Sequence, residues 1–246
     1  MEVIRSADNK TVKRINKLKQ KKYRDEYGEF FVEGYRNVAD TCAARAESVR
    51  TVAMSETAYA EFGDKFSDFE IAVIADNVFE KLSDTVGSQG VLSVNGIPEP
   101  LFPVSERCIL LDRVRDPGNV GTIIRTAVAC GYDVVLNNCA DAYSPKVVRS
   151  AMSAMVKCRI GTDIDPATIK SAGYELIVAD MRGENVFGAA HAQKYCVVIG
   201  NEANGVDGRI VEIADRLLAV PQNDMESLNA AVAAGVMMFG LRYAAK

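Results

Sequence analysis

The sequence contains one histidine, His191, and this scarcity argues against two common kinds of active site. A zinc site and a Ser-His-Asp triad both depend on histidine, so neither chemistry is expected and no metal is predicted. The six cysteines stand singly, without a C-x-x-C pair, which predicts buried thiols rather than a disulfide framework. They are Cys42, Cys108, Cys130, Cys139, Cys158 and Cys196.

Long apolar runs are also missing. The most apolar stretch, residues 230–241, is far shorter than the roughly 20 residues that span a bilayer. The first ten residues include Glu2, Arg5, Asp8 and Lys10 rather than the apolar core of a secretory signal. We therefore expect a soluble, cytoplasmic protein with no membrane role. Its 246 residues are enough to bury two modest cores or one large one.

The formal net charge of −4 hides an uneven distribution along the chain. The first 24 residues hold nine basic residues against two acidic ones, a net charge of +7, so the remainder carries −11. The basic residues are Arg5, Lys10, Lys13, Arg14, Lys17, Lys19, Lys21, Lys22 and Arg24. This asymmetry predicts that a polyanion binds at one end of the molecule. The alternative is an ordinary solvated helix face.

The first part of the chain is predicted to be a small α/β unit. Apolar residues recur every three positions in the basic segment, which predicts an amphipathic helix over residues 11–21 with a cationic outer face. A short strand over residues 29–32 ends before Gly34, and a helix follows over 37–46. Buried strands are predicted over residues 49–54 and 71–75.

A proline-rich stretch then marks a linker, which we place at residues 97–104 between a domain at 1–96 and a second domain at 105–246. In the second domain apolar runs alternate with helical patterns, as in a parallel sheet covered on both faces. The runs are residues 108–111, 134–136, 176–179, 196–199 and 217–220. Ligands bind such sheets at the loops that leave the carboxyl ends of the strands.

The first of three such loops lies in residues 111–127. Asn119 is predicted to cap a helix that runs to Cys130 and stops at Gly131. Arg125 is the only charge among the apolar residues of that helix. A guanidinium beside apolar packing needs an anionic partner, unless its side chain only reaches out to water.

The second loop, residues 198–205, follows a fully apolar strand, and its glycines allow close approach of backbone to a ligand. It lacks the spacings of phosphate-binding and dinucleotide-binding loops, so ATP and nicotinamide cofactors are poorly supported. Glu202 in this loop could orient a hydroxyl or neutralise a cation, or it could be an ordinary turn residue.

The third loop lies in residues 219–235, where a strand ends at Pro221 and a helix is predicted to start near Ser227. The small residues of this helix permit close approach of a ligand or of another helix. Ser227 could serve the site or only cap the helix.

Taken in this order, the three loops resemble the signature motifs of the SpoU/TrmH branch of the SPOUT RNA methyltransferases. Residues 6–9 and 30–34, together with Leu18 and Arg24, are similar to the family's N-terminal RNA-substrate-binding domain, which resembles the ribosomal L30e fold. The resemblance therefore covers nearly the whole chain. It implies an L30e-like α/β domain followed by a C-terminal parallel-sheet SPOUT domain with a deep trefoil knot.

The resemblance also implies S-adenosylmethionine as methyl donor, a ribose 2′-hydroxyl of structured RNA as acceptor, and a homodimer in which Arg125 of one subunit works near the cofactor of the other. Matching positions give the catalytic residues Asn119, Arg125, Glu202, Ser227 and Asn229. The cofactor contacts fall on Gly200, Val220 and Leu228. RNA contacts are expected at Lys13, Lys17, Lys21, Arg24, Lys146 and Arg149.

Two positions depart from the family pattern. Gln222 stands where the family usually has methionine, and Ala231 where it usually has a second serine. Both lie close to the expected pocket and could alter affinity or target choice. Ribosomal RNA is favoured over transfer RNA as substrate, by analogy with the N-terminal domain. The open alternatives are a transfer-RNA 2′-O-methyltransferase and a non-catalytic RNA-binding assembly factor on the same fold.

Overall fold

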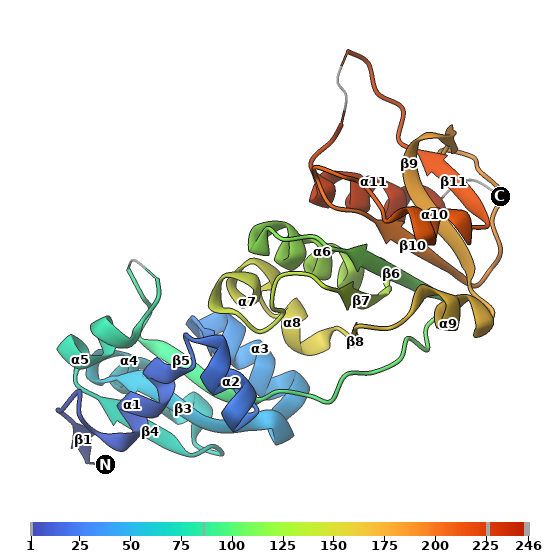
Figure 1. Cartoon of the computed structure of the whole chain (residues 1–246). Helices are drawn as coiled ribbons and strands as arrows, with labels where there is room; N and C mark the ends of the chain where they lie inside the picture. Colours follow the sequence, from blue (N-terminus) through green and yellow to red (C-terminus); the bar gives the residue numbers. More distant parts are fainter. Residues whose placement is uncertain (1, 86, 225–226, 244–246) are drawn as a thin grey trace. The chain divides into compact units, whose positions relative to one another are not determined.

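The computed structural model describes residues 2–85, 87–224 and 227–243 (Figure 1). The chain divides into two compact units. The first comprises Met1–Glu99 and Tyr143–Val156, and the second comprises Pro100–Ala142 and Lys157–Lys246. The segment Tyr143–Val156 belongs to the first unit because it packs there: the rings of Phe30 and Tyr143 lie 4.9 Å apart.

The first unit is built on a five-stranded mixed sheet in the order β1-β4-β3-β5-β2. β1, β4 and β3 run parallel, and β5 pairs antiparallel with β3 and β2. The strands are β1 (Val3–Ile4), β2 (Glu29–Glu33), β3 (Val49–Ser55), β4 (Ile71–Ile74) and β5 (Val91–Gly96). The helices are α1 (Lys10–Lys17), α2 (Lys21–Tyr27), α3 (Tyr35–Arg45), η1 (Ala46–Ser48), α4 (Glu56–Phe62), η2 (Gly63–Phe66), α5 (Asp76–Leu82), α7 (Pro145–Ala151) and α8 (Ala154–Lys157).

The predicted strands over residues 29–32, 49–54 and 71–75 are confirmed, and so is the α/β character of this unit. The single helix predicted over residues 11–21 is wrong, because α1 ends at Lys17 and α2 begins only at Lys21. The chain turns at Leu18, whose side chain is fully buried.

Arg24 completes this turn. Its side chain is buried, and Nη1 donates a hydrogen bond of 2.7 Å to the carbonyl oxygen of Leu18. Arg24 is thus held inside the protein, where it helps to join α1 to α2, and its predicted RNA contact stays a prediction.

The second unit contains a six-stranded sheet in the order β11-β9-β10-β6-β7-β8, and every strand pair in it is parallel. The strands are β6 (Arg107–Asp112), β7 (Asp133–Asn137), β8 (Ile160–Thr162), β9 (Glu175–Asn185), β10 (Tyr195–Ile199) and β11 (Arg216–Ala219). The helices are α6 (Pro117–Cys130), α9 (Pro166–Ser171), α10 (Gly208–Glu212) and α11 (Ala230–Tyr243). The predicted parallel sheet is confirmed, and β9 extends six residues beyond the predicted run.

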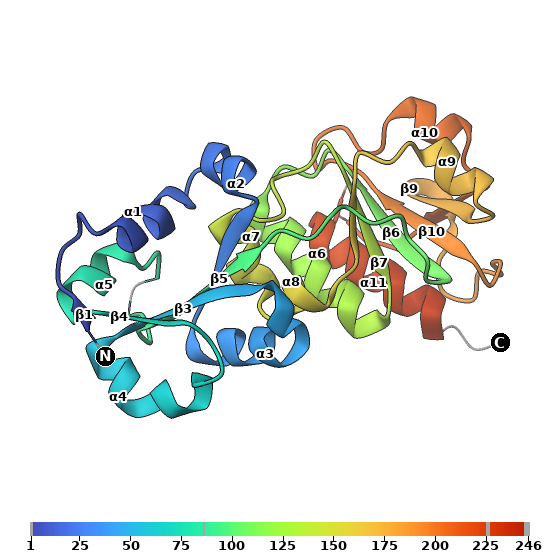
Figure 2. The same cartoon turned by 90° about the horizontal axis from the view of Figure 1, so that it is seen from below.

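Helices cover both faces of this sheet (Figure 2). α6 and α11 lie side by side on one face, and α9 and α10 cover the other. Alternate residues of the strands explain the two layers: Cys108 and Leu110 pack with Ile169 of α9 and Ile210 of α10, while the intervening Ile109 faces the opposite side. The trefoil knot stays a prediction.

The six cysteines are free thiols. Four of them are buried, as predicted, but Cys42 and Cys139 are only half-buried. Burial raises the pKa of the Cys139 thiol to about 11, so it stays protonated at neutral pH. No helix in the described part of the chain is both long and apolar enough to cross a membrane.

Candidate active site

The first loop leads from β6 into α6, and the cap of this helix differs from the prediction. Asp116, not Asn119, is the N-cap, because its side chain accepts a 2.8 Å hydrogen bond from the Asn119 backbone amide. Pro117 begins the helix, as proline favours at this position. The predicted end is confirmed, since α6 stops at Cys130 and Gly131 adopts a left-handed conformation.

Because Asp116 caps α6, the side chain of Asn119 is available for other partners, and it links the three loops by hydrogen bonds. Its Nδ2 donates to Oε1 of Glu202 at 2.7 Å, and its Oδ1 accepts from Nδ2 of Asn229 at 3.0 Å. Three polar residues from three separate loops thus form one hydrogen-bonded chain, which we call the Glu202–Asn119–Asn229 chain. Each amide is fixed by its partner, so the donors and acceptors left over have defined directions.

The second loop folds back on itself after β10. Asn201 and Gly205 exchange backbone hydrogen bonds of 2.9 and 3.1 Å, and Gly205 has a left-handed φ of 64°. At Gly200 a Cβ atom would lie 2.1 Å from the carbonyl carbon of Gly205, so only glycine fits there. The loop therefore presents backbone, rather than a side chain, at the end of β10.

The third loop ends where α11 begins at Ala230, three residues after Ser227. The cap is Asn229, whose Oδ1 accepts hydrogen bonds from the amides of Ala231 and Val232 at 2.9 and 3.2 Å. The predicted helix start near Ser227 is thus three residues early. Met225 and Glu226 of this loop lie outside the described residues.

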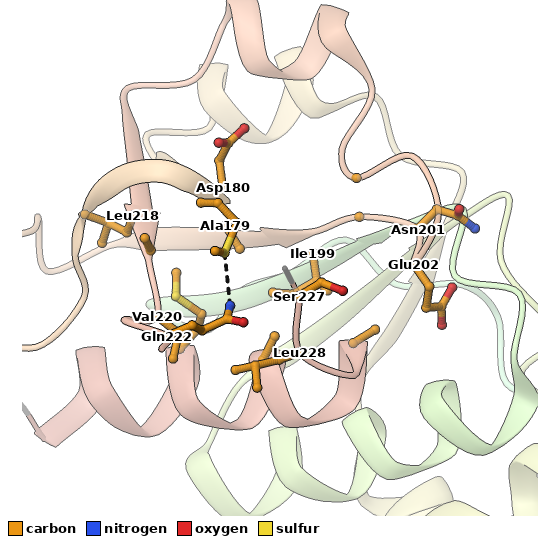
Figure 3. Close-up of a pocket in the computed structure, with 17 residues that line it drawn as sticks. Ala179, Asp180, Ile199, Asn201, Glu202, Leu218, Val220, Gln222, Ser227 and Leu228 are labelled. Carbon is orange, nitrogen blue, oxygen red and sulfur yellow. Dashed lines mark hydrogen bonds between the residues drawn. The ribbon is translucent and has the colours of Figure 1, made fainter. Parts of the chain in front are cut away.

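A cavity opens between these loops, beside the carboxyl ends of β10 and β11 and the middle of β9 (Figure 3). The space that it encloses, with the open mouth included, is about 760 Å³. Most of its lining is apolar, from Ile199, Leu218, Val220, Leu228 and Met237. Such walls suit a flat heterocycle, so the residues present fit an adenosyl group.

The structure places five of the predicted site residues around this cavity. They are Gly200, Glu202, Val220, Ser227 and Leu228. Asn119 and Asn229 join it through their hydrogen bonds to each other and to Glu202. The middle of β9 contributes residues that sequence reasoning missed, namely Ala179, Asp180 and Met181. The sequence did contain a signal for them, because they end or follow the apolar run of residues 176–179, just as the three predicted loops follow other apolar runs.

Asp180 adds a charge to the cavity wall. The Arg182 guanidinium, hydrogen-bonded to this carboxylate at 2.7 Å, holds the pKa of Asp180 below its usual range. The group is therefore anionic at neutral pH.

Arg125 differs from its predicted surroundings. It lies on the exposed face of α6, whereas Val120, Ile123 and Ile124 of the same helix are fully buried. Its guanidinium has no hydrogen bond or ion pair with any residue that the structure describes. The anionic partner that the sequence predicted for Arg125 is therefore not found among the described residues. The guanidinium can instead bind an anion from outside the protein.

The predicted RNA-contacting residues lie in the first unit. Lys13 and Lys21 form exposed ion pairs of 2.7 Å with Asp8 and Asp25. Lys17 donates to the hydroxyl of Tyr27 at 3.4 Å. Arg149 pairs with Asp84 at 3.3 Å, and Lys146 is exposed on the same helix, α7. Exposed ion pairs of this kind are weak, so these cations can exchange their partners for phosphates.

His191 lies apart from the cavity. Its two ring nitrogens lie 2.8 and 3.0 Å from the carbonyl oxygens of Ala192 and Leu241, and its ring packs on Tyr195. Among the described residues there is also no cluster of three or more histidine, cysteine or acidic side chains that could hold a metal.

Comparison with known proteins agrees with this architecture. The model of the SpoU rRNA methylase family matches residues 106–239, and that of the MRM3-like substrate-binding domain matches residues 9–93. The chain is 30% identical to a 23S rRNA (guanosine(2553)-2′-O)-methyltransferase, RlmP, of Bacillus subtilis strain 168. That alignment covers 98% of this chain and 100% of the relative.

Two solved structures extend the comparison to the cofactor. An AdoMet-bound rRNA methyltransferase from Sinorhizobium meliloti superposes with a TM-score of 0.86 at 28% identity, covering 98% of this chain and 97% of that one. The SpoU methyltransferase AviRb from Streptomyces viridochromogenes, in complex with AdoMet, gives 0.83 at 25% identity over 95% and 97%. The chain therefore belongs to the SpoU rRNA methylase family of S-adenosylmethionine-dependent RNA methyltransferases.

Proposed function

We propose that this protein transfers a methyl group from S-adenosylmethionine to a ribose 2′-hydroxyl of ribosomal RNA. The observation that carries the proposal is the Glu202–Asn119–Asn229 chain, which joins all three loops beside a cavity fit for an adenosyl group. The ribosomal substrate is supported by the relative from Bacillus subtilis, whose name specifies 23S rRNA, and by the match to a substrate-binding domain.

The chemistry needs positioning above all. Bound S-adenosylmethionine supplies a methyl group activated by its sulfonium. Glu202 and Ser227 line the cavity and Asn229 adjoins it, so these side chains hold the acceptor hydroxyl in line by hydrogen bonds. Arg125, bound to a phosphate of the RNA, orients the ribose and stabilises negative charge that develops on its oxygen.

The proposed function includes a homodimer. The exposed apolar residues Val232, Phe239 and Tyr243 are spaced by seven and four positions and so lie on one face of α11. The rings of Phe239 and Tyr243 stack at 5.9 Å. A second copy covering this face would bring an Arg125 toward the cofactor of its partner.

We expect Phe239→Arg to convert a dimer into a monomer and to reduce methylation at least tenfold, because a charge would then be buried in the interface. Light scattering coupled to gel filtration measures the mass. Val104→Arg is the control, since Val104 is 68% exposed and lies outside α11. A Phe239→Arg protein that stays dimeric would exclude this face as the interface.

The cationic face of α1 and its continuation are expected to bind RNA phosphates. Replacing Lys13, Lys17 and Lys21 together by alanine should weaken RNA binding and lower the slope of log affinity against log salt by about 2, because each phosphate contact contributes roughly 0.7–0.9. Titrations at several salt concentrations measure this slope. Lys65→Ala with Lys81→Ala serves as control, since both lysines are exposed and lie outside the basic segment. An unchanged slope in the triple variant would assign these lysines to a solvated surface.

The target class is tested by mapping ribose methylation across total RNA from cells with and without the gene. We expect at least one position in ribosomal RNA to lose its methyl group when the gene is absent. Loss confined to transfer RNA would favour the transfer-RNA enzyme, and no change at any position would favour a non-catalytic assembly factor.

A further inference from the structure

The side-chain amide of Gln222 makes few good hydrogen bonds within the protein. Its Nε2 donates to the sulfur of Met181 at 3.0 Å, and a thioether is a weak acceptor. Its Oε1 is buried and has no hydrogen-bond partner among the described residues. A buried carbonyl oxygen without a donor is costly, and native proteins rarely leave one so. Both ends of this amide are therefore available for better partners.

The surroundings of Gln222 indicate what that partner is. Gln222 lines the cavity at the end opposite Glu202 and Asn201, next to Val220 (Figure 3). The transferred methyl group must lie near the Glu202–Asn119–Asn229 chain, because the acceptor hydroxyl is held there. The remainder of the cofactor then extends toward Gln222.

Two parts of the cofactor could fill this end. The amino-acid part carries a carboxylate and an ammonium. Asp180 on the cavity wall could pair with the ammonium, but the carboxylate would be repelled by Asp180 and would lose its hydration among Leu218, Val220 and Leu228, with no cationic side chain among the described residues that line the cavity. The adenine ring is flat and uncharged, and its edge sets an amine donor beside a ring-nitrogen acceptor. A glutamine amide pairs with that edge through two hydrogen bonds.

We propose that Gln222 recognises the adenine of the cofactor. Its Oε1 accepts a hydrogen bond from the exocyclic amine, and its Nε2 turns from the Met181 sulfur to donate to an adjacent ring nitrogen. Gln222 is thus a specificity-determining residue in this chain, at a position where methionine could make neither bond. This inference rests on the proposed function, because it requires S-adenosylmethionine in this cavity.

The test measures binding rather than turnover. Calorimetry compares S-adenosylhomocysteine with its 6-deamino analogue, in which hydrogen replaces the exocyclic amine. We expect the wild-type protein to prefer the amine-bearing ligand and the preference to fall about tenfold, or 1.4 kcal/mol, in Gln222→Met. Gln222→Glu is the matched control, since its carboxylate still accepts from the amine and should keep most of the preference.

The outcomes separate this inference from the proposed function. Normal binding of S-adenosylhomocysteine with the same preference in wild type and in Gln222→Met overturns the role of Gln222 alone. A wild-type protein that binds neither ligand overturns the proposed function, and this inference with it. Melting temperatures of the variants verify that each is folded.

Discussion

Arg125→Ala is expected to slow single-turnover methylation by about a thousandfold, which corresponds to roughly 4 kcal/mol of transition-state stabilisation. The expected effect is large because the guanidinium meets both the RNA phosphate and the developing charge on the ribose oxygen. S-adenosylmethionine affinity should change by less than about threefold, since Arg125 is exposed and does not line the cavity. Rapid-quench methylation and calorimetry measure the two quantities separately.

Arg209→Ala is the matched control for this experiment. Its side chain is 88% exposed and pairs only weakly with Asp207, so its removal should leave both quantities unchanged. Arg125→Lys keeps the charge but loses the planar fork of donors, and should fall between the wild type and Arg125→Ala. If methylation by Arg125→Ala stays within about tenfold of the wild type, the proposed role of Arg125 is wrong.

Gly200→Ala is expected to weaken S-adenosylmethionine binding by about a hundredfold. The added Cβ would lie 2.1 Å from the backbone of Gly205, and backbone cannot move aside as a flexible side chain can. The turn closed by Asn201 and Gly205 would open, and the backbone groups that face the cavity at the end of β10 would be displaced.

Gly208→Ala controls for the general cost of replacing glycine. A Cβ at Gly208 meets nothing within 4 Å, so this variant should bind the cofactor like the wild type. Calorimetry measures both affinities, and thermal melting verifies that the rest of the fold survives. Equal affinities for the two variants would show that the close approach at Gly200 is not needed for binding.

The strands of the second unit could be predicted because each is an apolar run between turn formers, a pattern that depends on sequence alone. The break between α1 and α2 could not. Periodicity continues through Leu18, and the chain turns there because of a tertiary arrangement in which Leu18 is buried and Arg24 hydrogen-bonds its carbonyl. Local propensity does not contain that information.

The N-terminal caps of α6 and α11 were predicted at the wrong residues, because each loop contains more than one good capping residue. Asp116 and Asn119 are both good caps, as are Ser227 and Asn229, and sequence cannot say which of each pair takes the role. The structure assigns capping to Asp116 and Asn229. The same assignment leaves the Asn119 side chain available for Glu202, so the local choice of cap determines the chemistry of the site.

The small residues of α11 had two interpretations from sequence, and the structure realises both. Ala230 and Ala233 line the cavity, whereas a Cβ atom at Gly235 would lie 3.8 Å from Cγ2 of Thr126 in α6. One helix thus serves the ligand along one side and close helix packing along another. The burial of Arg24 and the exposure of Arg125 show the limit of such inference, because the sign of a charge does not say which way it points.

The most direct test of the central claim is the chemical position of the transferred methyl group. Purified protein is incubated with radiolabelled S-adenosylmethionine and ribosomal RNA from cells that lack the gene, and the RNA is then hydrolysed in alkali. A methylated 2′-hydroxyl cannot attack the neighbouring phosphate, so the account predicts label in alkali-resistant dinucleotides. Label released as mononucleotides would place the methyl group on a base and contradict the account, as would an absence of label from an RNA shown to be unmethylated.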